Sequence, residues 1–534
     1  MNNKSKIMLI SAVYFVQGAV GITGMAEFIL TRNYFHFSWI QLAFLGSLAT
    51  LAWCIKPLYG FVTDFLPLFG LRRKPYILIA SLLTVSGYLM LGLFATNFHT
   101  IIMASILISV GLGFSDVIID GLVIESSDKE TVGKYQALCW RAKAFGILLA
   151  SLFSGYLLER AFFSKHLLAL PFTQWLMHTF PKTIQNTLVS GINILDIRYL
   201  FLFTAVLPLV VVIISLAFRE EKVIASNRGA HYPLAYIFGA VVAFAATALV
   251  VIAALTTKPW IAGIRNETLS SLLVMIIWML WIGSYFSYLI KNKMASSTLF
   301  LAATFLFLWR FTPSFGAPWS NYFLNTLALS KEKLGFIATI TSLGWIIGSF
   351  IYNKYLDKYE IKKLLYWTVI IGVGLSFTQL IVATPALATK VGSFFVIKYS
   401  AAILLYPVYL FGYGTEAWNV LMSQPAILNI DAVLSFLLEI MFIISFLPLL
   451  KLAALVTPKG VEATNFSLLT SIMNLGLAFG TISGGIIYTY IEGQYKLAGI
   501  SFNGLHLTII IGALTSLLCL LVLKRLVLTA ENKN

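Results

Sequence analysis

Residues 39–95 read WIQLAFLGSLATLAWCIKPLYGFVTDFLPLFGLRRKPYILIASLLTVSGYLMLGLFA, which is two long apolar runs joined by a short basic loop. The runs extend from Trp39 to Phe61 and from Pro75 to Ala95. A helix needs about 20 apolar residues to cross the roughly 30 Å hydrocarbon core of a bilayer, so each run is long enough to span it. This stretch therefore predicts two neighbouring transmembrane helices.

The composition of the whole chain leads to the same expectation. Of the 534 residues, 59% are hydrophobic and 11% are charged, and the mean hydropathy is +0.89. Soluble globular chains are about 45–50% apolar and about 25% charged. The strands of a membrane barrel would alternate apolar and polar residues, whereas these runs are continuous. We therefore expect an all-α polytopic membrane protein.

Apolar runs of this kind recur along the chain and predict fourteen spans. They are Ile7–Leu30, Trp39–Phe61, Pro75–Ala95, Ile101–Ile124, Val132–Leu158, Tyr199–Phe218, Pro233–Thr256, Leu269–Ile290, Leu299–Leu324, Leu334–Tyr352, Leu364–Ala383, Ala432–Leu455, Phe466–Tyr490 and Leu505–Leu523. We predict an N-terminal six-helix bundle over 1–220, a cytoplasmic linker with two additional helices over 221–297, and a C-terminal six-helix bundle over 298–534. Two equal bundles can rock about a site near the membrane midplane.

One further apolar segment, Phe394 to Phe411, lies in an insert at about 385–429. A lone span here would invert every later helix and move the basic loop near Lys451 and the tail at Lys524 and Arg525 to the outside. Cytoplasmic loops carry an excess of Lys and Arg, which places both termini in the cytoplasm. We therefore predict that this segment is re-entrant, interfacial or half of a hairpin.

A family resemblance begins at residues 56–76, KPLYGFVTDFLPLFGLRRKPY. This stretch resembles the folate-biopterin transporter family, and its loop resembles the signature loop of the major facilitator superfamily. Three further segments agree: SDVIID at 115–120, FLFLW and TPS within 305–314, and PKGVEAT at 458–464 leading to NLG at 474–476. The chain departs from the usual twelve-helix pattern by its two central runs and its long insert.

The resemblance implies a major facilitator fold, here with two six-helix bundles plus about two extra central helices. It also implies a secondary active transporter of folate- or pterin-like solutes that works by alternating access with protons as the coupling ion. A carrier of another bulky metabolite, such as S-adenosylmethionine, and a non-transporting membrane receptor on the same scaffold remain alternatives.

The resemblance assigns a gating role to the loop after the second predicted span. Its residues are Lys56, Gly60, Asp64, Arg72 and Arg73, which the family likeness implies latch the cytoplasmic side when that side is closed. The alternative interpretation is ordinary cytoplasmic positive charge.

Ionisable residues within spans are candidates for substrate binding or proton coupling, because burying a charge in a bilayer costs several kcal/mol unless it finds a partner or water. Asp116 and Asp120 are four residues apart and share one helix face. Arg141 and Lys143 on the next helix can pair with them. A structural ion pair that locks the first bundle is the alternative. The resemblance favours a functional role for Asp116 and Asp120.

The later half offers a second group of candidates for substrate binding or coupling. Arg310 follows Trp309 in a helix that Pro313 and Gly316 interrupt, and its guanidinium can bind a carboxylate such as the glutamate tail of a folate. Aromatic residues near it can stack on a pterin, although packing and the interfacial belt explain most aromatic residues. Glu439 lies deep in its span and can carry a proton, or it can be neutralised in helix packing.

Other polar and small residues predict helix packing. Asn474 lies in mid-helix and needs a hydrogen-bond partner in lipid, so we expect it to join two helices. Gly476, Gly480, Gly484 and Gly485 recur at intervals that permit close approach of a neighbouring helix.

Several function classes lack their chemical signatures in this sequence. The three cysteines and six histidines have no metal-ligand spacing, and no Gly-rich loop ends in Lys-Ser/Thr, so we expect no metal, no cofactor and no enzyme activity. The net charge of +16 comes from short clusters between apolar runs, which argues against nucleic-acid binding. The expected partners are a small solute, protons and the lipid bilayer. The expected location is the cell (inner) membrane if the source is bacterial.

Overall fold

The computed structural model describes residues 3–126, 132–167, 169–171, 173–175, 188–189, 192–220, 234–256, 266–291, 297–456, 462–491, 494–497 and 500–526. Twelve helices in this part of the chain are long and apolar enough to cross a membrane. The longer helices are α1 (Asn3–Ala19), α3 (Trp39–Cys54), α4 (Lys56–Phe65), α5 (Lys74–Phe94), α6 (Phe98–Ser126), α7 (Val132–Glu159), α11 (Ile194–Ala217), α12 (Leu234–Thr256), α13 (Asn266–Lys291), α14 (Ser297–Arg310), α16 (Lys331–Ile351), α17 (Ile361–Ala383), α19 (Phe395–Tyr413), α21 (Ala426–Leu455), α22 (Glu462–Ile491), α23 (Gly504–Ser516) and α24 (Leu518–Arg525).

Short elements connect these helices. They are η1 (Val20–Thr23), α2 (Gly24–Phe28), η2 (Ile29–Tyr34), α8 (Phe162–Leu167), α15 (Gly316–Asn321), η3 (Tyr322–Thr326), η4 (Tyr352–Leu356), α18 (Pro385–Gly392), η5 (Gly414–Glu416) and α20 (Ala417–Met422). Two small antiparallel hairpins pair β1 (Leu188–Val189) with β2 (Ile192–Asn193) and β3 (Gln494–Leu497) with β4 (Ile500–Asn503).

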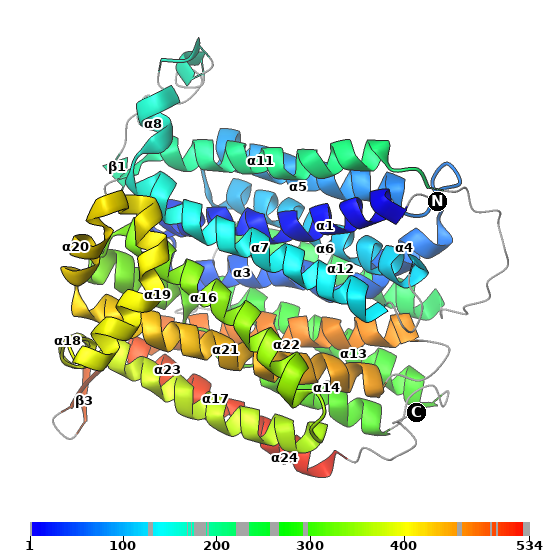
Figure 1. Cartoon of the computed structure of the whole chain (residues 1–534). Helices are drawn as coiled ribbons and strands as arrows, with labels where there is room; N and C mark the ends of the chain where they lie inside the picture. Colours follow the sequence, from blue (N-terminus) through cyan, green and yellow to red (C-terminus); the bar gives the residue numbers. More distant parts are fainter. Residues whose placement is uncertain are drawn as a thin grey trace.

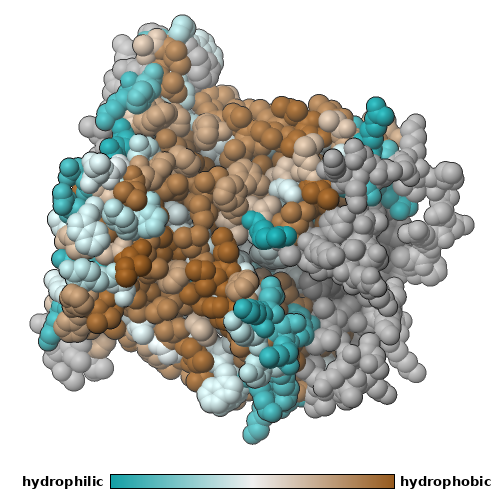
Figure 2. Space-filling model, in the orientation of Figure 1, coloured by the Kyte–Doolittle hydropathy of each residue, from teal (hydrophilic) through white to brown (hydrophobic). Residues whose placement is uncertain are grey.

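The long helices run side by side (Figure 1). The start of α1 and the end of α24 lie at one end of the molecule, which we call the termini end. Hydrophobic side chains cover the broad middle of the face drawn in Figure 2, and hydrophilic ones gather toward its edges. Large apolar side chains that are exposed in this way match a lipid surrounding rather than water. The expectation of an all-α polytopic membrane protein is confirmed.

Each of the fourteen predicted runs corresponds to a helix. Two of these helices are shorter than a full span, namely α3 and α14. The first of them, α3, ends next to Ile55, and α4 starts anew with Pro57 at its N-terminus. The chain therefore breaks within the second predicted span, and α4 is free to take its own contacts.

The break after α14 is held by the glycines of α22. Ser314 donates from its backbone N–H to the Gly480 carbonyl at 2.9 Å. A Cβ atom at Gly484 would lie 2.0 Å from the Ser314 carbonyl oxygen, and one at Gly476 would lie 2.5 Å from that of Phe307. No side chain fits at such distances, so the predicted close approach at these glycines is confirmed.

The connection between the first two helices of each half has the same backbone, displaced by 292 residues. In η2, Phe35 donates to the Leu30 carbonyl and Phe37 to that of Thr31, at 3.0 and 2.9 Å. In η3, Leu327 donates to Tyr322 and Leu329 to Phe323, at 2.9 and 3.0 Å. Two non-glycine residues at the same displacement, His36 and Ala328, have positive φ angles of 54° and 47°. We call these segments the repeat turns, and they support an internal duplication that relates the two halves of the chain.

The insert forms a cap at the end opposite the termini end, which we call the cap end. In Figure 1, α18, α19 and α20 gather there, and α19 runs across the direction of the long helices. Its Tyr409 ring lies 5.3 Å from that of Phe336, close to the start of α16. At the end of α18, a Cβ on Gly392 would lie 1.9 Å from the carbonyl oxygen of Ala426, where α21 begins. Because α19 also has the length and apolarity of a span, the prediction that residues 394–411 are re-entrant, interfacial or half of a hairpin stays a prediction.

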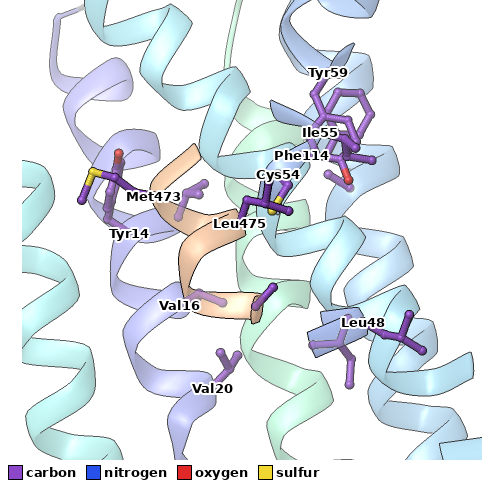
Figure 3. Packing of buried hydrophobic residues seen from close by; sticks show 14 of the residues in the cluster. Tyr14, Val16, Val20, Leu48, Cys54, Ile55, Tyr59, Phe114, Met473 and Leu475 are labelled. Carbon is purple, nitrogen blue, oxygen red and sulfur yellow. The ribbon is translucent and has the colours of Figure 1, made fainter. Parts of the chain in front are cut away.

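Buried apolar side chains join the two halves. Met473 and Leu475 of α22 belong to the same buried cluster as Tyr14 of α1 and Cys54 of α3 (Figure 3). In addition, Asn474 donates from Nδ2 to the Trp53 carbonyl at 3.3 Å. The predicted helix-joining role of Asn474 is thus confirmed, and α22 packs into the N-terminal half.

Candidate functional site

A cluster of charged groups lies between helices of the N-terminal half. We call it the charge cluster, and its members are Tyr14, Lys56, Asp116, Asp120 and Lys143. Lys56 Nζ lies 2.6 Å from Asp116 Oδ2, with the two side chains 12% and 7% exposed. The Tyr14 hydroxyl donates to Asp120 Oδ1 at 2.6 Å. Both carboxylates therefore have a partner that lipid could not provide.

The local fold explains why Lys56 enters this cluster. It is the first residue of α4, directly after the break at Ile55, and α4 packs on α6, which carries Asp116. Gly60 faces α6 at this point, and a Cβ there would lie 3.7 Å from Val117 Cγ1, an ordinary contact distance. The sequence grouped Lys56 with the gating loop. The structure pairs its ammonium with a carboxylate inside the bundle, and its gating role stays a prediction.

Lys143 faces the cluster from α7. Its ammonium lies over the Trp53 ring at 5.7 Å and over the Trp140 ring at 5.5 Å, while Lys56 lies 5.2 Å from the Trp53 ring. Such contacts stabilise a cation where water is scarce. Lys143 is also within electrostatic range of Asp116. By contrast, Arg141 is exposed.

Aromatic residues gather where α7 meets the C-terminal half. We call Trp140, Trp309, Trp345, Phe442 and Phe446 the aromatic cluster. The Trp140 and Trp345 rings are stacked, with centroids 6.0 Å apart and planes at 25°. Trp309 lies 5.8 Å from Phe442, and Phe446 lies 6.0 Å from Trp140. These separations fall in the range of attractive ring contacts.

Arg310 and Glu439 lie at this aromatic cluster. The Arg310 guanidinium carbon is 5.8 Å from the Trp309 ring and 5.7 Å from the Phe442 ring. Neither side chain makes a hydrogen bond or ion pair with the described part of the chain, although the two charges interact electrostatically. A guanidinium and a carboxylate in this state can both bind a polar ligand.

A cavity of about 220 Å³ adjoins the cluster between α7, α16 and α21. Small and hydroxylated residues line most of it, together with one indole and one carboxylate: Ala144, Ile147, Ser151, Ala338, Thr341, Ser342, Trp345 and Glu439. Residues of both halves thus share its wall.

The remaining gating-loop residues lie at the termini end, where α11 ends beside the start of α5. Glu220 accepts hydrogen bonds from the backbone N–H groups of Arg72, Arg73 and Lys74 at 2.8, 2.8 and 2.7 Å. In return, Lys74 Nζ donates to the carbonyl of Phe218 at 2.9 Å. This arrangement satisfies the free N–H groups at the start of α5. No sequence pattern marks Glu220, because its role depends on where α11 ends.

Arg73 is buried inside the N-terminal half. Its Nη1 donates to Thr63 Oγ1 at 3.0 Å, and it is 5% exposed. A Cβ at Gly121 would lie 2.7 Å from its Cζ, so the guanidinium packs directly on α6. The side chain of Asp64 lies outside the described residues.

At the cap end the two halves are in close contact. Asn33 and Asn325 exchange two side-chain hydrogen bonds of 2.9 and 2.8 Å. Arg160 donates to Glu332 at 3.0 Å, and this hydrogen bond raises the pKa of Arg160. A Cβ at Gly155 would lie 2.0 Å from the Lys331 carbonyl oxygen. These contacts close the cap end between α7 and α16.

A family model described as the BT1 family matches residues 17–392 and 431–533, which is most of the 534-residue chain. The chain belongs to the BT1 family. Both central helices, α12 and α13, lie within the matched residues. Residues 393–430, which include α19 and α20, fall between the two matched stretches.

Relatives of this BT1 family chain carry transporter names. A folate-biopterin transporter of Synechocystis sp. is 23% identical over 516 residues, covering 96% of this chain and 80% of that protein. Folate transporter 2 of Plasmodium falciparum is 23% identical over 509 residues, with coverages of 93% and 83%. Probable folate-biopterin transporter 4 of Arabidopsis thaliana is 31% identical over 159 residues, with coverages of 29% and 32%.

Solved structures show the fold of this BT1 family member. A D-xylose-proton symporter aligns with a TM-score of 0.57 at 13% identity and covers all of both chains. The peptide-family transporter PepTSo aligns with a TM-score of 0.56 at 13% identity, covering 98% of this chain and 97% of its own. The chain has the major facilitator fold, and it is an integral multi-pass membrane transporter of a small molecule.

Proposed function

We propose that this BT1 family transporter moves folate- or pterin-like solutes by alternating access and couples the movement to protons. The observation that carries the proposal is the pair Arg310 and Glu439, which lies against aromatic faces without a described hydrogen-bond partner. The names of the Synechocystis and Plasmodium relatives support the same substrate class.

The chemistry of a folate matches these groups. A folate has a flat bicyclic ring at one end and a glutamate with two carboxylates at the other. Stacked indoles such as Trp345 offer the ring an apolar face of the right shape. The fork of N–H donors on Arg310 suits a carboxylate, and it needs no rearrangement of an existing pair to bind one.

Proton coupling finds its best support in the charge cluster. Asp116 is engaged with Lys56, whereas Asp120 has a neutral partner in Tyr14. Two carboxylates stand against the two cations Lys56 and Lys143. A proton on Asp120 leaves an excess of positive charge, which favours entry of an anionic solute. Asp120 is therefore a better proton carrier than Glu439, which remains the alternative.

The orientation and the domain layout belong to the same proposal. Both termini face the cytoplasm, so the cap end faces outward, and a bacterial chain resides in the inner membrane. Residues 1–220 and 298–534 act as the two moving bundles, with 221–297 as the linker. The tight contacts at the cap end support an inward-facing arrangement of these bundles.

Uptake of labelled folate by cells that express the chain tests the proposal, with and without a protonophore. We expect saturable uptake that pterin competes for, that excess S-adenosylmethionine leaves unchanged, and that the protonophore lowers. Absence of folate and pterin uptake would refute the substrate class. Uptake that the protonophore leaves unchanged would refute proton coupling but not the substrate class. Binding of folate without its accumulation in the cells would indicate a receptor.

A further inference from the structure

We propose that the cavity beside Trp345 is the site for the flat ring of the solute, and that Glu439 selects rings that carry adjacent N–H donors on one edge. The inference rests on the proposed function and deepens it. The ligand class is an aminopyrimidine-fused heterocycle, of which pterin is the simplest example. The acidic tail of a larger solute lies outside this cavity.

The size of the cavity indicates which part of the solute it holds. Sites for complete drug-sized ligands measure about 300–1,000 Å³. The cavity here measures about 220 Å³, and its wall combines Ala144 and Ile147 of one half with Trp345 and Glu439 of the other. It accommodates a bicyclic ring but not a ring with its whole side chain.

Trp345 supplies the stacking face. Its ring is part of the cavity wall, and it also contacts the rings of Phe442, Phe446 and Trp140, the last of which is stacked on it. Stacked rings in contact have centroids about 4.5–7 Å apart. Trp140 and Trp345 are already at 6.0 Å, so no third ring fits between them and the ligand lies on the cavity side of Trp345. Trp140 packs on the opposite face of the Trp345 indole and fixes the plane of that ring.

Glu439 supplies the selectivity. It is the sole carboxylate among the residues that line this cavity, and it makes no hydrogen bond with the described part of the chain. The hydroxyl groups of Ser342 and Thr341 donate to the Ala338 carbonyl at 2.9 and 2.7 Å, so they are engaged. An ionised carboxylate only accepts hydrogen bonds, through two oxygens side by side. A ring edge with an amino group next to a ring N–H presents two parallel donors to it.

The geometry predicts which ring is rejected. Lumazine is the analogue of pterin that carries an oxygen in place of the amino group, so it has the same flat shape and nearly the same area. Its ring N–H can still donate to one carboxylate oxygen of Glu439, but its carbonyl oxygen would face the other, and no hydrogen would lie between those two oxygens. A buried site that loses a hydrogen-bond partner in this way discriminates strongly between isosteres.

Equilibrium binding of pterin and lumazine to the purified full-length chain in lipid nanodiscs tests the inference. We expect the wild-type chain to bind pterin at least about 10-fold more tightly than lumazine. Glu439→Gln offers one donor and one acceptor, and it should reduce this ratio to about one or below. Trp345→Ala should weaken both ligands by a similar factor, and Trp345→Phe should restore most of the affinity because it keeps a stacking face.

Each result bears on the inference. A wild-type ratio near one overturns it without any variant, and so does an unchanged ratio in a Glu439→Gln protein that retains the melting temperature of the wild type. In either case continued folate uptake leaves the proposed function standing. If the wild-type chain neither binds nor transports pterin and folate, the proposed function itself fails. Should Glu439→Gln not fold, Glu439→Asp keeps the charge, and its pterin preference should persist at lower affinity.

Discussion

The charge cluster and the aromatic cluster differ in how far their polar groups are already satisfied. In the charge cluster, Lys56 pairs with Asp116 and Tyr14 binds Asp120, each at 2.6 Å. In the aromatic cluster, Arg310 and Glu439 have ring faces and a cavity beside them but no described hydrogen bond. A satisfied ion pair is suited to hold or change a conformation, whereas an unsatisfied group is suited to bind a ligand. The two halves share the backbone of the repeat turns, yet their polar clusters differ in this respect.

Breaking the pair in the charge cluster should have the largest effect. Asp116→Asn leaves the Lys56 ammonium buried without its carboxylate, and loss of one partner of a buried pair costs about 3–5 kcal/mol. We expect a large drop in the melting temperature and loss of folate uptake, measured on purified protein and in cells. The neutral double variant Lys56→Gln/Asp116→Asn is the control and should regain stability without regaining uptake. A single variant as stable as the wild type would contradict the buried pairing.

Replacing Arg310, the cation beside the aromatic cluster, should have the second largest effect. Arg310→Ala removes the donors that we assign to the acidic tail, so folate uptake should fall about 10–100-fold, as a charge-assisted hydrogen bond implies. Uptake of pterin, which lacks that tail, should change little. Arg310→Lys keeps the charge but loses the fork of donors. Its folate uptake should lie between that of the wild type and that of Arg310→Ala. An equal loss for folate and pterin would mean that Arg310 supports the fold rather than the tail.

Removing the hydroxyl in the charge cluster should have a moderate effect. Tyr14→Phe deletes one hydrogen bond to Asp120, which costs about 1 kcal/mol. We expect a small decrease in thermal stability and a shifted pH dependence of uptake, measured from pH 5 to pH 8 in cells. Tyr59→Phe is a matched control, because the Tyr59 hydroxyl donates to the Ala52 carbonyl and not to a carboxylate. If both variants shift the pH profile alike, Asp120 is not the proton carrier.

Replacing Trp309, a member of the aromatic cluster that does not line the cavity, should have the smallest effect. Trp309 contacts Phe442 and Phe446 but is not part of the cavity wall. Trp309→Phe keeps an aromatic face under Arg310, so folate affinity should change by less than about 3-fold. Equilibrium binding measures this change. A loss as large as that of Trp345→Ala would place the ring site at Trp309 instead.

The sequence predicted the helices well because the length of an apolar run is fixed by the thickness of the bilayer. It also predicted that Asp116 and Asp120 share a face, because helix periodicity is local. It could not predict that Lys56 pairs with Asp116, because that depends on the break at Ile55 and on the packing of α4 against α6. The stacking of Trp140 on Trp345 likewise joins residues of different halves, and no local pattern marks it.

The hydrogen-bonded amides of Asn33 and Asn325 carry information about ancestry. The two residues occupy the same place in the two repeat turns, and each gives the other the bond that it receives, at 2.9 and 2.8 Å. A residue that meets its own counterpart reciprocally is the mark of a two-fold symmetric dimer. The amide pair therefore follows the approximate two-fold relation expected where one half of the chain repeats the other.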